Sequence, residues 1–70
     1  MLSAENHKLV ETHLGLARAI AAKMHRIMGG SVELDDLVAQ ALAGLSEAAG
    51  RYDPGAATPF GLFAQYRIRG

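Results

Sequence analysis

Hydrophobic and polar positions follow a helical period in three segments of this chain, which are separated by two loops. The first segment runs from about Ser3 to Met28, where apolar side chains recur at steps of three and four and form one stripe on a helix. The stripe consists of Val10, Leu14, Ala17, Ala21, Met24 and Met28. We expect Ser3 to cap this helix and Gly29-Gly30 to end it, because glycine adopts the left-handed conformation that often follows a helix. The stripe is predicted to face the core.

The second segment runs from about Leu34 to Ala49 and again spaces its apolar residues as a helix does. Its start is crowded by three acidic side chains: Glu33, Asp35 and Asp36. Unpaired N–H groups and the helix dipole favour negative charge there, so one interpretation of these acids is dipole compensation at a solvated helix end. Glu47 and Arg51 lie four residues apart, in the favourable order for an ion pair, and Gly50 is expected to end the helix.

The third segment follows a predicted turn at Tyr52-Asp53-Pro54-Gly55, where proline and glycine supply the turn dihedrals. Thr58-Pro59 predicts a helix start, because the hydroxyl can cap the helix and proline lacks an N–H that would be unpaired at the first position. Helical spacing continues through Phe60, Phe63, Ala64, Arg67 and Ile68. The three segments predict an all-α, three-helix domain: a long first helix antiparallel to the second, and a short third helix across one end.

The composition is typical of helices packed on helices, and the charge balance argues against duplex DNA as a partner of this chain alone. Half of the residues are hydrophobic, yet every aromatic residue lies in the last nineteen positions. The formal net charge is zero, from seven basic and seven acidic side chains. Proteins that hold duplex DNA alone usually carry a basic excess, so autonomous duplex binding is not expected. No apolar run approaches the ~20 residues of a membrane span, and we expect a soluble, cytoplasmic protein.

No set of residues predicts catalysis, a metal site or a cofactor. The three histidines, His7, His13 and His25, are not spaced to present two ligands to one ion, so we interpret them as surface residues. Asp35 and Asp36 are adjacent, and on a helix their side chains diverge by about 100°, which is poor geometry for an acid–base pair. The chain has no cysteine nucleophile, and no serine has an evident histidine and acid partner. We therefore expect no enzymatic activity.

Three blocks of the sequence resemble a known family. The blocks are "LARAIAAKM", "DDLVAQALAGLSEAAGRYDP" and "FGLFAQYRIRG". Together they resemble the second conserved region of bacterial RNA polymerase sigma factors of the sigma-70 family, over roughly Leu14 to Gly70. The flagellar-type alternative sigma factors are the most similar, because their corresponding segment also ends in Arg-Ile-Arg-Gly.

The resemblance implies a polymerase-binding surface on the second helix. In the family, a helix with the pattern Asp-Leu-Ile-Gln-x-Gly docks on a coiled coil of the largest subunit of core RNA polymerase. The matching contacts here would come from Asp36 and Leu37, with Gln40 as a further candidate. Ala39 stands where the family has a contacting glutamine, and Ala41 replaces a glycine. Because alanine lacks the amide of glutamine, the resemblance implies docking that is weakened or lost.

The closing helix resembles the start of the segment that captures the promoter −10 element. In that segment, aromatic side chains stack on unpaired bases of the non-template strand. Such stacking contributes ~1–3 kcal/mol of binding free energy per base. The resemblance implies nucleic-acid contacts by Phe63, Tyr66, Arg67 and Arg69, with the arginines meeting phosphates. Helical spacing also allows Phe60 and Phe63 to be core residues, and it leaves Tyr66 as the better candidate for exposure.

The resemblance leaves two functions open. In the first, residues 1–70 are one truncated region-2 domain that acts in transcription initiation, binding core polymerase and, within a longer protein, single-stranded promoter DNA. The family's third helix continues past Arg-Ile-Arg-Gly, so the end at Gly70 is expected to cut through it. In the second, the chain is a stand-alone regulatory or interaction module, a homodimer or the partner of an anti-sigma protein. An apolar patch left by the short third helix would favour such association.

Overall fold

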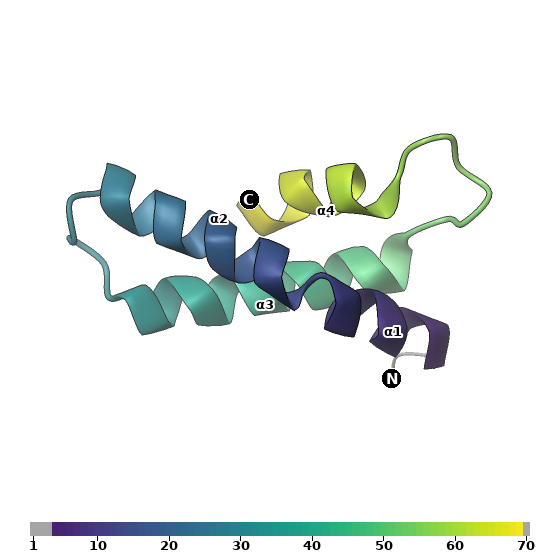
Figure 1. The fold of residues 1–70 in the computed structure, drawn as a ribbon, viewed down its shortest axis with the longest axis horizontal. Helices are drawn as coiled ribbons and strands as arrows, with labels where there is room; N and C mark the ends of the chain where they lie inside the picture. The colour runs from purple at the N-terminus through teal and green to yellow at the C-terminus, as the bar shows by residue number, and fades with distance from the viewer. Residues whose placement is uncertain (1–3, 70) are drawn as a thin grey trace.

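The computed structural model describes residues 4–69, and its regular structure is helical throughout these residues (Figure 1). The helices are α1 (Ala4–Thr12), α2 (Leu14–Ile27), α3 (Leu34–Arg51) and α4 (Phe60–Arg69). The all-α prediction is confirmed. The predicted cap Ser3 and the terminal Gly70 lie outside the described residues.

The first predicted helix is in fact two helices, and the break falls at His13. The N–H of His13 donates to the Val10 carbonyl, 3.1 Å away, instead of to Leu9 four residues back. The Leu9 carbonyl accepts from the His13 ring at Nδ1, 2.8 Å away. The hydroxyl of Thr12 likewise donates to the carbonyl of Lys8. Two side chains thus bond to backbone carbonyls of α1 just before the break, and such bonds bend a helix.

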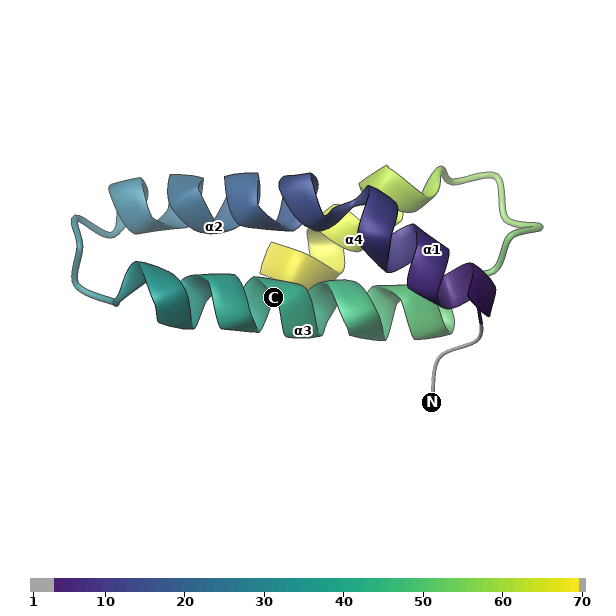
Figure 2. The same cartoon turned by 60° about the horizontal axis from the view of Figure 1, so that its bottom comes forward.

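Two glycines follow the end of α2, as predicted. Gly29 and Gly30 have φ values of 65° and 80°, in the left-handed region that glycine adopts without a steric penalty. Their N–H groups donate to the carbonyls of Arg26 and His25, which satisfies acceptors left free at the end of α2. The chain then returns as α3, antiparallel to α2 and packed along it (Figure 1 and Figure 2).

Alanine dominates the core between these helices. The buried side chains are Ala17, Ile20, Ala21, Leu37, Ala41, Leu45, Ala48, Ala49, Phe60, Ala64 and Ile68. Six of the eleven are alanine, so the helices can pack at short distances. The predicted stripe is confirmed at Ala17 and Ala21, and Met24 packs partly buried against the core. The prediction is wrong for Met28, which is 41% exposed because α2 ends one residue earlier.

A short ordered loop connects α3 to α4. The Asp53 carboxylate accepts from the N–H of Gly55 at 2.9 Å, and the Tyr52 hydroxyl donates to the Thr58 carbonyl at 2.8 Å. The predicted turn is thus present. The first α4 hydrogen bond runs from Phe63 to the Pro59 carbonyl. From there α4 lies across the α2–α3 pair, away from the α2–α3 turn (Figure 2).

The helices α3 and α4 meet at Gly44. A Cβ atom on this residue would lie 2.9 Å from the Arg67 carbonyl oxygen and 3.0 Å from Cα of Ile68. Only a glycine allows this approach, because contacts between such atoms are normally 3.4 Å or longer. The predicted end of α3 at Gly50 is wrong by one residue. Gly50 remains helical, and the helix ends after Arg51. The next residue, Tyr52, adopts an extended backbone conformation with φ −70° and ψ 133°.

Candidate functional site

The start of α3 presents acids to solvent. Glu33 precedes the helix, and its carbonyl accepts the first α3 hydrogen bond from the N–H of Leu37 at 3.2 Å. Its side chain makes no capping hydrogen bond. Asp35 and Asp36 follow in the first turn, and both are exposed. This arrangement places negative charge at the positive end of the α3 dipole, as predicted from the sequence.

The three residues predicted to bind polymerase do not share one environment. Asp36 and Gln40 are exposed and lie four residues apart, so their side chains point to the same side of α3. Leu37 is only 5% exposed and belongs to the core. Its side chain packs inward among the other core residues.

Aromatic rings surround the start of α4. The Phe60 ring is buried and lies edge-on to both His13 and Tyr52, with centroid distances of 4.8 and 5.1 Å. The core alternative for Phe60 is therefore confirmed. Phe63 is half-buried, and its ring lies 5.5 Å from that of Tyr52. One part of the Phe63 side chain supports the core while another part reaches solvent.

The two arginines predicted to bind nucleic acid differ in their partners. Arg67 donates to the Glu47 carboxylate at 3.2 Å, and its guanidinium lies 5.7 Å from the centre of the Phe63 ring. Glu47 also forms the predicted pair with Arg51, at 3.7 Å. Arg69 is exposed, and within residues 4–69 it has no ion-pair partner. The two arginines thus differ in whether their charge is paired within the described residues.

The outer surface of α4 carries Tyr66. Its side chain is 74% exposed, which confirms the expectation of exposure. Arg69 lies three residues further along the same helix, so the two side chains are neighbours on its surface. An exposed aromatic ring beside a cation can stack on a base while the cation meets its phosphate.

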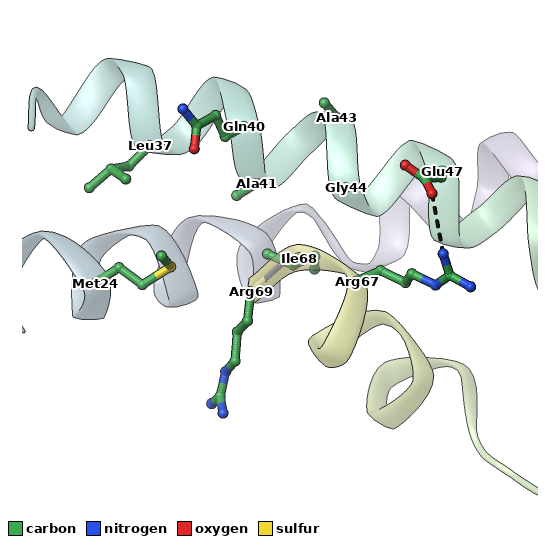
Figure 3. A pocket seen from close by; sticks show the side chains of 10 residues that line it. All are labelled: Met24, Leu37, Gln40, Ala41, Ala43, Gly44, Glu47, Arg67, Ile68 and Arg69. Atoms are coloured by element: carbon green, nitrogen blue, oxygen red, sulfur yellow. Dashed lines mark hydrogen bonds and ion pairs between the residues drawn. The ribbon is translucent and has the colours of Figure 1, made fainter.

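A cavity of about 320 Å³ lies between α2, α3 and the end of α4 (Figure 3). It is lined by Met24, Leu37, Gln40, Ala41, Ala43, Gly44, Glu47, Arg67, Ile68 and Arg69. The structure thus brings four predicted residues to one cavity: Leu37 and Gln40 from α3, and Arg67 and Arg69 from α4. Asp36, Phe63 and Tyr66 do not line it. The cavity therefore joins only part of each predicted set of residues.

Sequence reasoning missed two contacts of this region. The Glu47–Arg67 pair joins residues twenty positions apart, so no helical spacing reveals it. His13 was predicted to lie on the surface, which is wrong: it is half-buried against Phe60. Its position among the polar residues between two apolar stretches gave no signal for this packing. In the part of the chain that the structure describes, no cluster of three metal-ligating side chains occurs.

Residues 9–70 match the family model described as sigma-70 region 2, and this chain belongs to that family. The RNA polymerase sigma factor FliA of Salmonella typhimurium is 38% identical over 66 residues, which cover 94% of this chain and 28% of the relative. FliA of Escherichia coli K12 gives the same identity and coverage. FliA of Pseudomonas aeruginosa is 35% identical over 63 residues, 90% of this chain and 26% of the relative.

The resemblance found in the three sequence blocks is thereby confirmed. This chain spans little more than a quarter of the length of the sigma factors that it matches. No solved structure gives a significant match. Among residues 4–69, no helix combines the length and the apolar character needed to cross a membrane.

Proposed function

We propose that this domain works in transcription initiation in the cytoplasm, as the part of a sigma factor that binds core RNA polymerase. The observation that carries the proposal is the match to sigma-70 region 2 over nearly the whole chain. The curated relatives, which are named RNA polymerase sigma factors, support the same role. The proposal has two parts, a docking surface on α3 and a nucleic-acid surface on α4.

The docking surface is the exposed side of the first turns of α3. Asp36 supplies a carboxylate, and Gln40 supplies an amide one turn later on the same side. Leu37 fixes the helix beneath them through its place in the core. Ala39 is exposed and offers no hydrogen-bonding group. We therefore expect weak docking on the coiled coil of the largest polymerase subunit, with Asp36 as its main polar contact.

The nucleic-acid surface combines Tyr66, Phe63 and Arg69. Tyr66 has the exposure that base stacking needs, and Phe63 can contribute an edge of its half-buried ring. Arg69 is the better phosphate contact, because Arg67 is already bound to Glu47. With a net charge of zero, the 70-residue chain is expected to show no measurable binding to promoter duplex at physiological salt. Single-stranded promoter DNA would be bound within a longer protein.

A titration against the isolated polymerase coiled coil tests the docking part. We expect saturable binding in the high micromolar range for the wild-type chain and a clear loss of affinity for Asp36→Ala. The matched control is Glu11→Ala, which removes an exposed acid from α1 and should bind as the wild type does. Absence of saturable binding by the wild type, or equal losses in both variants, would exclude docking through Asp36.

A further inference from the structure

The α2–α3 turn carries an exposed apolar surface that we call the tip patch: Ile27, Met28 and Leu34. Their side chains are 74%, 41% and 40% exposed. Figure 1 and Figure 2 both show this turn at one extreme of the molecule, beyond the ends of α1 and α4. The described residues leave much of the patch exposed, although Ile27 also borders a groove that Arg69 of α4 lines. Exposed neighbouring apolar side chains of this kind favour association with a partner.

Opposite charges flank the tip patch on its two sides. The last turns of α2 carry the exposed cations Lys23 and Arg26. The start of α3 carries exposed acids: Glu33, Asp35 and Asp36. Within residues 4–69 both ion pairs involve Glu47, so none of these tip charges is used in an ion pair inside the described chain. The surface is therefore apolar in the centre, positive along one helix and negative along the other.

We propose that the tip patch binds the tip patch of a second copy of this chain. A two-fold axis perpendicular to the plane of α2 and α3, placed at the turn, sets two hairpins end to end. This rotation brings α2 of one copy opposite α3 of the other. The cations at Lys23 and Arg26 then face the acids of the partner, while the apolar side chains meet at the axis. The charges on this surface are thus complementary to those on the same surface of the second copy.

A second copy fits this surface better than a partner of one charge. A strongly basic partner would be repelled by α2 and a strongly acidic one by α3, whereas the net charge of zero removes long-range repulsion between two copies. The patch is small, so the dimer is expected to be weak and in rapid exchange with the monomer. This association does not rest on the proposed binding of polymerase.

Sedimentation velocity from about 10 µM to about 1 mM tests the dimer. We expect the average mass to rise toward that of a dimer with concentration, and the rise to diminish at high salt because the flanking charges are screened. Ile27→Gln should weaken association about tenfold or more, equivalent to ~1.4 kcal/mol. The control Leu62→Gln replaces an exposed apolar residue on α4 and should leave the dimer unchanged. Circular dichroism verifies that both variants are folded.

Charge reversal distinguishes this geometry from non-specific association. The double variant Lys23→Glu/Arg26→Glu and the double variant Glu33→Lys/Asp35→Lys should each be monomeric, and a mixture of the two should form a heterodimer. Asp36 is left intact in both, so neither variant removes the main polar contact proposed for polymerase docking. A wild-type chain that is monomeric at every concentration overturns the proposal. So does a dimer that survives Ile27→Gln, that Leu62→Gln disrupts, or that the mixed variants fail to restore.

Discussion

Substitution of Gly44 by alanine gives the sharpest test of the contact between α3 and α4. The added Cβ would lie 2.9, 3.0 and 3.3 Å from three backbone atoms of Arg67 and Ile68. These atoms belong to a helix backbone and cannot rotate away as a flexible side chain would, so α4 must shift. Overpacking of this kind costs about 1–3 kcal/mol. Alanine in a helix interior is otherwise favoured over glycine by about 0.8–1.0 kcal/mol. We expect a net destabilisation of about 1 kcal/mol.

The matched control is Gly15→Ala in α2, where a Cβ would meet nothing within 4 Å. Here only the helix propensity changes, so we expect stabilisation of up to about 1 kcal/mol. Urea unfolding followed by circular dichroism measures both variants, and in thermal melts 1 kcal/mol corresponds to about 4–8 °C for a domain of this size. Amide hydrogen exchange should accelerate in α4 for Gly44→Ala alone. Equal stabilisation by both substitutions would refute the close packing at Gly44.

Four further substitutions test other features of the structure. Glu47→Gln removes two partly exposed ion pairs, so the free energy of unfolding should fall by less than about 1 kcal/mol. This loss should shrink at high salt, because salt screens exposed charges. A large loss that persists at high salt would contradict the assignment of both pairs to the surface. His13→Ala removes a ring packed on Phe60 and should cost about 1–2 kcal/mol in thermal melts, while exposed His7→Ala serves as a near-neutral control. Tyr66→Ala should change stability by less than about 0.5 kcal/mol. Phe60→Ala should cost about 3 kcal/mol or more, and similar losses at both positions would show that Tyr66 is not exposed.

The helical segments and most of the core could be predicted from the sequence, because they depend on local periodicity. The stripe through Ala17 and Ala21, the turn at Gly29-Gly30 and the start of α4 after Pro59 all follow from neighbouring residues. The break at His13 could not be predicted in the same way. The break depends on whether the His13 ring or the His13 backbone N–H bonds to the Leu9 carbonyl. Both arrangements are compatible with the same pattern of apolar residues.

The candidate site was less predictable than the fold, because exposure depends on contacts between distant segments. Leu37 matches the family pattern, but only the packing of α2 on α3 shows that its side chain is internal. Arg67 and Arg69 are equivalent in the sequence. They differ in the structure because α4 crosses α3 near Glu47, twenty residues away from Arg67. Exposure of Tyr66 was predictable, since the apolar spacing of α4 already assigned the opposite side to the core.

The alanine-rich core has a consequence for how this domain tolerates genetic variation. At six of the eleven buried positions the side chain is a single methyl group, so shortening it removes little and creates almost no void. Enlarging it, by contrast, must force two helix backbones apart. A saturation library should therefore be asymmetric: glycine at Ala17, Ala41 and Ala48 would cost chiefly the ~0.8–1.0 kcal/mol of helix propensity and would often survive, while valine or leucine would be eliminated. At these positions the domain is constrained chiefly by volume.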